Sequence, residues 1–427
     1  MQIKQTAKRI VSLAFVRHAA TLVSGNVIGQ MIALAAYLLL CSLYTPTDFG
    51  LFHLFLSVGG FLAFFTTCSF HYAIVLPQND KMGVACTQIC LIINLIATTI
   101  CLIGLLTVGP WLTSATHTDA LTPLLPLLSL YIFACGLWST LNYWFIRNKQ
   151  FRSIAHYQIG LNTCNSAAKV GLGACHVPGG LITGTLIGGY LSLLMSGWHL
   201  RGSYRQIARY SAVRTRVCLR KYSKFLYFTF PKDLTNYLGG NLPSLLLAPY
   251  FPLAELGFFG LAVTLAMRPV NLIVNAVYQS LYQQCIELYN QHLSMRFLER
   301  ILLRSIVIVT PCFACLYFAI PYLIDFLLGS QWQPTATYMQ RILPWILFTL
   351  LLNPFDFLAD IFGRQGTLLV FEIVLTLLRA IALLSGIKTG NFATAITLYA
   401  ACSCLVMALR TLWYVRLIYK YEKTLTP

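Results

Sequence analysis

The stretch ELGFFGLAVTLAMRPVNLIVNAVYQSLYQQ, residues 255–284, is apolar over a length that can cross a bilayer, yet it carries a cation near its middle. An arginine at mid-bilayer costs about 2.5–3.5 kcal/mol on insertion scales, so it usually faces a protein interior or a water-filled cavity. Polar residues recur along the stretch at Thr264, Arg268, Asn271 and Asn275. This helical spacing puts them on one stripe. We therefore predict a membrane helix whose polar stripe lines a wet space.

The composition extends this prediction to the whole chain. Of 427 residues, 58% are hydrophobic and only 10% are charged, whereas a soluble protein carries about 25% charged residues. We therefore predict an all-α integral membrane protein. Segments of about 20 mostly apolar residues can each cross a bilayer as a helix. Twelve occur, at 21–43, 51–76, 84–108, 121–145, 157–177, 180–199, 234–252, 257–284, 301–328, 338–362, 367–387 and 391–416.

The basic residues predict the orientation. If the N-terminus is inside, twenty-four of the 30 Lys and Arg residues fall on cytoplasmic segments, and the only one on an outer loop is Lys388. Short cytoplasmic loops retain Lys and Arg, so both termini are predicted to be cytoplasmic. The net charge of +18 could suggest nucleic acid. However, the basic residues are spread over the loops of one membrane face, as expected for cytoplasmic loops next to anionic lipid headgroups. We therefore predict no nucleic-acid partner.

The cysteines do not indicate a metal centre. Fourteen are scattered through the predicted spans, and the one close pair, Cys312 and Cys315, lies in an apolar helix without a nearby His or Asp. They are typical of small apolar packing residues. We predict neither a metal nor a cofactor.

A repeat relates the two halves of the chain. Residues 44–52, YTPTDFGLF, and residues 250–259, YFPLAELGFF, share Tyr-x-Pro, an acid two residues before glycine and an aromatic two after it. Six helices per half is an even number, so the halves have the same orientation. We predict two six-helix bundles, 1–205 and 234–427, related by a pseudo-twofold axis along the membrane normal and joined by a basic cytoplasmic linker at 206–233.

Polar residues inside the predicted spans are the candidates for a site. In the first half Asn26 and Gln30 share a helix face, and Asn162, Asn165, Ser166 and Lys169 form a second stripe with a cation near mid-membrane. His71, at the end of the second span, is either an interfacial histidine with a satisfied hydrogen bond or a titratable group in the pore.

The second half adds charged residues of three kinds. Arg379 is deep, whereas Arg410 is close enough to the inner face to snorkel. Asp360 and Arg364 are four apart and predict a local ion pair. Asp356, one turn deeper, is either a group that binds a coupling ion or proton, or a buried hydrogen-bonding partner.

Several short motifs resemble the polysaccharide flippase branch of the multidrug/oligosaccharidyl-lipid/polysaccharide exporter superfamily. They are TPTDFGLF at 45–52, AIVLP at 73–77, RNKQFRSIA at 147–155, NLPSLLL at 241–247, LGFF at 256–259, and GSQW at 329–332 followed by Pro344-Trp345. Their order covers nearly the whole chain. Two places depart from the pattern: Ser69 and His71 stand where many relatives have a basic and an acidic residue, and Thr264 stands where some have the arginine.

The resemblance implies a bacterial inner-membrane transporter. It would move an undecaprenyl-diphosphate-linked oligosaccharide outward by alternating access, for O-antigen, capsule or exopolysaccharide synthesis, alongside a polysaccharide polymerase and chain-length regulator. Lys169 and Arg268 would bind the diphosphate, with Arg379 as a further cation, and amides would bind sugar hydroxyls. Asp356 and His71 are the coupling-ion candidates.

Two other functions compete with this one. A cation-coupled drug antiporter of the same superfamily would require acids rather than bases in its cavity. A membrane-bound polysaccharide polymerase or ligase would require a sizeable outer loop carrying chemistry. The longest outer loop, near residues 109–120, offers only His117 and Asp119. We therefore predict a transporter, not an enzyme.

Overall fold

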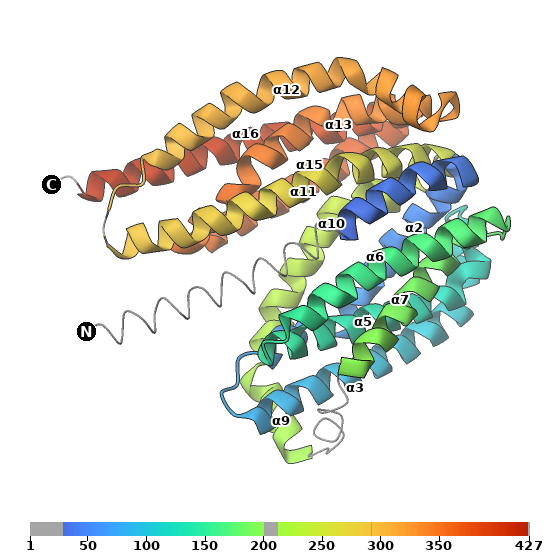
Figure 1. The fold of residues 1–427 in the computed structure, drawn as a ribbon, viewed down its shortest axis with the longest axis horizontal. Coiled ribbons are helices and arrows are strands. Elements are labelled where there is room, and N and C mark those ends of the chain that lie inside the picture. Colours follow the sequence, from blue (N-terminus) through green and yellow to red (C-terminus); the bar gives the residue numbers. More distant parts are fainter. Residues whose placement is uncertain (1–28, 200–211, 292, 426–427) are drawn as a thin grey trace. The chain divides into compact units, whose positions relative to one another are not determined.

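A computed structural model describes residues 29–199, 212–291 and 293–425. Every regular element in those three ranges is helical (Figure 1). The chain divides into two compact units, and each is described by itself. The first holds Phe55–Leu234 and the chain up to Thr45, and the second holds Pro46–Leu54 and the chain from Thr235 onward.

Most of the long helices of the first unit follow the predicted spans. After the helix Gly29–Leu43 they are α2 (Pro46–Ala63, shared with the second unit), α3 (Asp80–Thr107), α4 (Gly109–Ala115), α5 (Leu125–Arg147), α6 (Phe151–Ala174), α7 (Gly180–His199) and α9 (Ala212–Lys221). A π-helical segment, Phe225–Thr229, leads from α9 towards the second unit.

The second unit contains the rest of the helices. They are α10 (Phe230–Leu247, which begins in the first unit), α11 (Leu253–Asn290), α12 (Phe297–Leu328), α13 (Gln333–Leu352), α14 (Phe357–Ile361), α15 (Gln365–Lys388) and α16 (Phe392–Leu425). α11 contains the stretch that first indicated a membrane protein, and it is helical on both sides of Pro269.

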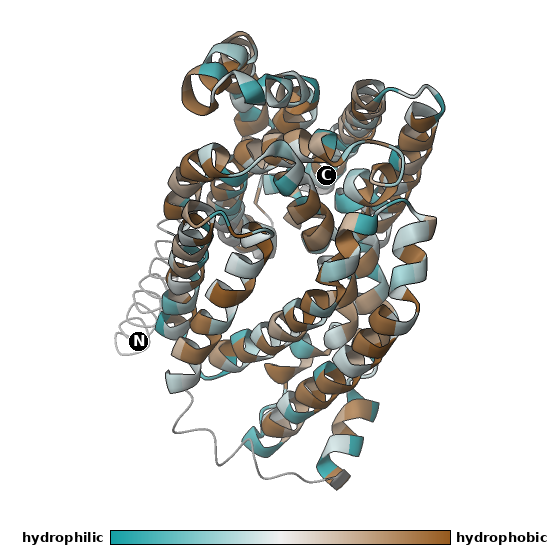
Figure 2. Cartoon of the chain, turned by 90° about the vertical axis from the view of Figure 1, so that its right-hand side faces the viewer, coloured by the Kyte–Doolittle hydropathy of each residue, from teal (hydrophilic) through white to brown (hydrophobic). Residues whose placement is uncertain are grey.

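Hydropathy confirms that the chain spans a membrane. Within the described residues, nine helices are long and apolar enough to cross a bilayer, and Gly29–Leu43 is a shorter apolar helix. Figure 2 shows hydrophobic residues along most of the length of these helices. α6 is long enough to span, but its polar stripe lowers its mean hydropathy below that of the other spans. The protein is therefore an all-helical, multi-pass membrane protein.

The second span differs from the prediction. It was expected at residues 51–76, but its α-helix α2 ends at Ala63 and is followed by 3-10 turns at Phe64–Thr66 and Phe70–Ile74. The cause lies at Cys68 and Ser69, whose φ angles of 45° and 57° are left-handed. An α-helix of L-residues cannot continue through that conformation. The apolar composition gave no sign of this break.

The repeated outer turns meet at two glycines, within the second unit. A Cβ atom on Gly50 would lie 1.7 Å from the carbonyl oxygen of Leu253, and one on Gly257 would lie 1.9 Å from the carbonyl oxygen of Pro46. Gly257 follows Gly50 in the sequence by the same number of residues as Leu253 follows Pro46. The contact is therefore reciprocal, as the sequence repeat requires. Only glycine allows two backbones to approach this closely.

The buried Trp332 of the GSQW motif packs beside this contact. It is fully buried, and its ring meets Phe49 of α2 at 5.1 Å and Phe258 of α11 at 5.9 Å, edge to face in both cases. The edge of an aromatic ring is attracted to the face of another. Three of the motifs behind the resemblance thus pack together in one place.

We expect Gly257→Ala to lower the melting temperature of the detergent-solubilised protein. The new methyl group must displace the backbone of α2, and overpacking of this kind costs about 1–3 kcal/mol. The matched control is Gly240→Ala in α10, where a Cβ atom meets nothing within 4 Å. This control should be neutral or slightly stabilising, because alanine is the better helix former. Equal melting temperatures for both variants would contradict the close contact.

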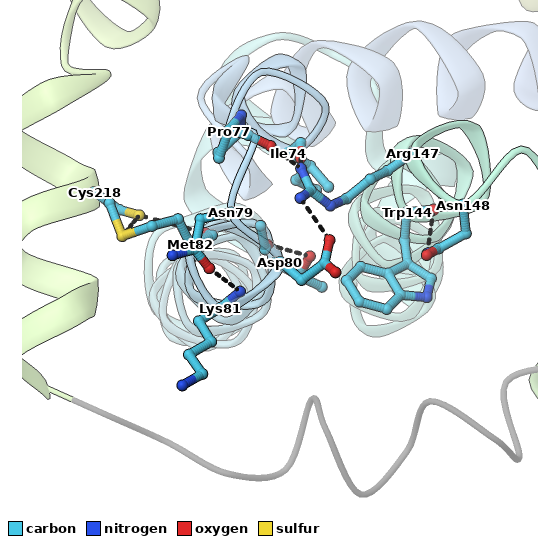
Figure 3. Close-up of polar contacts among 12 residues, drawn as sticks. Ile74, Pro77, Asn79, Asp80, Lys81, Met82, Trp144, Arg147, Asn148 and Cys218 are labelled. Atoms are coloured by element: carbon cyan, nitrogen blue, oxygen red, sulfur yellow. Dashed lines mark hydrogen bonds and ion pairs between the residues drawn. The ribbon is translucent and has the colours of Figure 1, made fainter.

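A second pair of motifs meets at the end of α5 (Figure 3). Arg147 donates from Nη1 to the carbonyl oxygens of Ile74 and Pro77, at 2.9 and 2.7 Å, and its Nη2 pairs with Asp80 at 3.1 Å. The guanidinium therefore binds the loop between the AIVLP motif and α3. A Cβ atom on Gly83 would lie 2.4 Å from the guanidinium carbon. This glycine makes room for the arginine.

The turn between α11 and α12 is held by a carboxylate from the end of α16. Glu422 is 6% exposed and accepts hydrogen bonds from the hydroxyl of Ser294 and the backbone N–H of Met295. It also pairs with Nε of Arg296 at 3.3 Å. The last helix thereby stabilises a turn far away in the sequence.

Candidate functional site

The polar stripe of α6 lies against a row of glycines on α7. Gly184 is so close to α6 that a Cβ atom there would lie 2.9 Å from the backbone nitrogen of Lys169, and one on Gly188 would lie 2.5 Å from that of Asn165. Helices pack this closely in membranes where small residues recur every four positions. Gly180, Gly184 and Gly188 have that spacing. The row positions both polar residues and could have been found from the sequence.

The side chains of this stripe differ in exposure. Lys169 is 8% exposed, and the hydroxyl of Tyr44 donates to its backbone carbonyl at 2.8 Å. Asn165 is half-buried, and its carbonyl oxygen has no hydrogen-bond partner in the structure. A polar atom buried without a partner is costly, so it marks a place where a ligand hydroxyl or a water could donate.

The helix Gly29–Leu43 packs against the same stripe. A Cβ atom on Gly29 would lie 2.7 Å from the amide nitrogen of Asn162. Gln30 is half-buried beside it. Asn26, the other predicted residue of this helix, lies outside the described residues. In the first unit the structure therefore places Asn162, Asn165 and Lys169 along α6, with the helix that carries Gln30 packed against Asn162.

The stripe of α11, in the second unit, is more open. Arg268 is half-buried, while Asn271 and Asn275 are exposed. Thr264 donates to the carbonyl oxygen of Gly260 at 2.8 Å and so satisfies its hydroxyl within the helix. The stripe presents a guanidinium followed by two amides along one helix face, a set of groups that can bind an anion and adjacent hydroxyls.

Arg379 is enclosed inside the second unit. It is 6% exposed and donates from Nε to Ser403 at 2.8 Å and from Nη1 to the carbonyl oxygen of Gly239 at 3.2 Å. Its guanidinium carbon lies 5.1 Å from the centre of the Trp345 ring and 4.7 Å from that of Tyr399. Cation–π contacts of this kind stabilise a buried guanidinium. We infer that Arg379 links α10, α13, α15 and α16 rather than binding substrate.

Arg410 was expected to snorkel towards the inner face, and this expectation is wrong. The side chain is 3% exposed and donates to Glu372 at 2.9 Å and Asn353 at 2.8 Å, with Asp356 at 3.5 Å. Tyr414 also donates to Asp356, at 2.7 Å. Two carboxylates and the Asn353 side-chain oxygen surround the guanidinium, so its charge is compensated inside the unit. Asp356 is thus in a charged, hydrogen-bonded cluster.

A second local expectation is also wrong. Asp360 does not form the predicted pair with Arg364 among the described contacts; it accepts a hydrogen bond from the side chain of Gln365 at 3.1 Å. α14 ends at Ile361, and Gly363 has a left-handed φ of 62°. Asp360 and Arg364 therefore do not lie on one continuous helix, although the predicted ion pair required that they do.

We expect Arg410→Gln to deplete the protein from the membrane. Removing one partner of a buried ion pair typically costs about 3–5 kcal/mol, and the lower end applies here because the two carboxylates are partly exposed. Arg416→Gln, an exposed arginine further along α16, is the control and should be neutral. Adding Glu372→Gln to Arg410→Gln should restore part of the abundance. Unchanged abundance of the single variant, measured by immunoblotting, would contradict the cluster.

His71 lies outside the spans, in the 3-10 turn Phe70–Ile74. Its Nδ1 is 2.9 Å from the hydroxyl of Thr67, and its ring packs on Tyr72 at 4.4 Å and Tyr143 at 4.9 Å. Burial lowers the pKa of His71 to about 4, so the ring is neutral at neutral pH. Asp356 therefore remains the better candidate for coupling.

Metal ligands do not converge anywhere in the described ranges. No group of three or more His, Cys, Asp or Glu side chains there could hold a metal ion. Cys312 and Cys315, which were predicted to be small apolar packing residues, are exposed on α12.

An all-helical membrane protein with a cation on a polar stripe in each unit has the features of a transporter. The chain belongs to the polysaccharide biosynthesis protein family, whose model matches residues 39–381. Among curated proteins no sequence relative is found.

Solved structures show the same fold at low identity. MurJ, a lipid II flippase in an inward closed conformation, aligns with a TM-score of 0.70 and 12% identity over 96% of this chain and 91% of that one. An inward-facing multidrug resistance transporter of the MATE family and MOP superfamily aligns with a TM-score of 0.66 and 14% identity, over 92% of this chain and 96% of that one. A MOP superfamily transporter from Pyrococcus furiosus, described as having a binding pocket of reverse polarity, aligns with a TM-score of 0.56 and 13% identity, over 95% of this chain and 96% of that one. The predicted fold class, with twelve helices, is confirmed.

Proposed function

We propose that the protein flips undecaprenyl-diphosphate-linked oligosaccharide units across the bacterial inner membrane for O-antigen, capsule or exopolysaccharide synthesis. The family is one of polysaccharide biosynthesis, and a lipid II flippase has the same fold. The observation that carries the proposal is the half-buried Arg268 with exposed Asn271 and Asn275 along one face of α11. That arrangement suits a ligand with an anionic headgroup and hydroxyl groups beside it.

We propose that one cation from each unit binds the headgroup. In this proposal Arg268 of the second unit and Lys169 of the first bind the diphosphate during alternating access. Guanidinium groups bind phosphates with two parallel hydrogen bonds, whereas an ammonium acts as a point charge. The amides Asn26, Gln30, Asn165, Asn271 and Asn275 would bind sugar hydroxyls. Asn165, whose buried oxygen lacks a partner, is the strongest of these.

We expect Arg268→Gln and Lys169→Gln to abolish surface polysaccharide while the protein stays in the membrane. Each loses a charge-assisted contact, which should weaken binding at least about tenfold. Arg268→Lys should restore export only partly, because it loses the forked geometry. Export and membrane abundance are measured together. Arg304→Gln, an exposed arginine on α12, is the control.

The outcomes separate binding from stability. Normal export at normal abundance in both variants would eliminate the binding role. Loss of abundance instead of activity would assign the two cations to the fold. Asp356 is already engaged by Arg410 and Tyr414, so it does not need Arg268 as its partner.

We further propose that transport is coupled to an inward cation gradient through Asp356. Asp356 and Glu372 share one guanidinium, so the cluster has one negative charge in excess when both acids are ionised. A proton or monovalent cation could neutralise it. Unchanged transport in vesicles after both proton and sodium gradients are collapsed would refute this coupling.

The orientation and partners are part of the same proposal. Both termini and the basic segment at 206–233 would be cytoplasmic, between bundles at 1–205 and 234–427. External labelling of a cysteine placed at Arg214 would refute this orientation. A polymerase and a chain-length regulator would act on the product. Membrane lipids surround the spans.

Two other functions, a drug antiporter and a membrane-bound polymerase or ligase, make different predictions. A multidrug resistance transporter of the MATE family shares the fold, and a cation-coupled antiporter of that kind would export drugs or other small molecules rather than support polysaccharide synthesis. A polymerase or ligase would need reactive groups on an outer segment, and the short helix α4 carries none of the usual acid or base pairs. We therefore propose a transporter without enzymatic activity.

A further inference from the structure

A group of polar aromatic side chains gathers at one end of the first unit. Tyr72 and Tyr143 have ring centres 5.1 Å apart, nearly perpendicular, and His71 contacts both rings. Phe225 stacks on Tyr72, with ring centres 6.1 Å apart and planes 28° apart. The four rings come from three separate places in the sequence. All four are partly exposed, so the group has an open side.

A carboxylate lies at the edge of these rings. Asp233 accepts a hydrogen bond from the hydroxyl of Ser69 at 3.0 Å, and its side chain is 18% exposed. Lys232 lies 3.9 Å away on the more exposed side. Burial, then the charge of Asp233, raises the pKa of Tyr72, so the phenol stays protonated and can donate. The group thus combines ring faces, hydroxyl donors and one carboxylate acceptor.

Two backbone irregularities build this group. Cys68 and Ser69 are consecutive non-glycine residues in the left-handed region, a conformation that L-residues rarely adopt. Phe225–Thr229 is π-helical, a conformation that is rare and often found at functional sites. The first places Ser69 and His71, and the second places Phe225 and leads to Asp233. The left-handed pair and the π-helical segment thus converge on one group of side chains, as backbone irregularities often do at functional sites.

The chemistry of the group matches a sugar better than a diphosphate. A pyranose ring has an apolar C–H face that packs on an aromatic ring and hydroxyls at its edge that bond carboxylates and phenols. A diphosphate would be repelled by Asp233, and the neighbouring Lys232 is already within ion-pair distance of that acid. The group therefore complements the part of a lipid-linked ligand that the basic stripes do not.

We propose that Tyr72, Tyr143, Phe225 and Asp233 form a saccharide-binding subsite that recognises the glycan of the lipid-linked substrate. This inference rests on the proposed function, because it assumes that the substrate carries both a diphosphate and a sugar. The subsite selects for the sugar, while Lys169 and Arg268 bind the headgroup whatever sugar it carries. His71 supports the two tyrosine rings from one side.

The test compares two lipids on the purified full-length protein in nanodiscs. The probes are undecaprenyl diphosphate and the same lipid carrying N-acetylglucosamine, and binding is measured by calorimetry. The wild type should bind the glycosylated lipid more tightly. Tyr143→Leu and Asp233→Asn should each weaken binding of the glycosylated lipid about tenfold and leave binding of the sugar-free lipid unchanged. Tyr143→Phe, which keeps the ring, should lose less.

The matched control is Tyr227→Leu, a 73% exposed tyrosine on the same π-helical segment, which should leave both affinities unchanged. Melting temperatures identify any variant that fails to fold, and Tyr143→Phe then carries the test. If the wild type binds both lipids equally, or the variants keep the preference, the subsite is refuted while the flippase proposal stands. If the wild type binds neither lipid, the proposed function itself fails.

Discussion

The contact between the backbones of α2 and α11 at Gly50 and Gly257 constrains the starts of both helices and the packing of Trp332 beside them. Each glycine lies against a carbonyl oxygen at the start of the other helix, so neither position tolerates a side chain. The start of each helix fixes where its span begins, and the position of Trp332 follows from the two aromatic rings beside the contact. The sequence repeat therefore places a glycine at each of the two equivalent positions where the backbones come close together.

The intramembrane cations show two ways of making charge tolerable in an apolar surrounding. Arg379 is enclosed by aromatic rings and hydrogen-bond acceptors, and Arg410 by acids, so both guanidinium groups are engaged inside one unit. Arg268 instead lies half-buried on a polar face that continues into exposed amides. The first arrangement uses charge to hold helices together, and the second places a guanidinium in line with exposed amides. The exposure of the neighbouring side chains therefore distinguishes the proposed binding residue from the two enclosed arginines.

Composition and spacing predicted the helical fold, most span positions and the two polar stripes, because each depends on residues near one another in the sequence. The environments of Arg379 and Arg410 could not be predicted in this way. Their partners lie on other helices, and position along a span does not show which helices are neighbours. The break after α2 was missed because left-handed Cys68 and Ser69 have no glycine signature. The glycine row on α7, by contrast, was visible in the sequence and was overlooked.

The carboxylate of Glu422 bears on how the chain assembles during synthesis. It holds the turn before α12 through Met295, which precedes it by 127 residues. A ribosome adding about 5–20 residues per second needs roughly 6–25 s to cover that interval. During that time α12, α13, α15 and most of α16 must enter the membrane while the turn between α11 and α12 lacks its final partner. The order of insertion, and not only the finished set of contacts, therefore decides when the second unit becomes rigid.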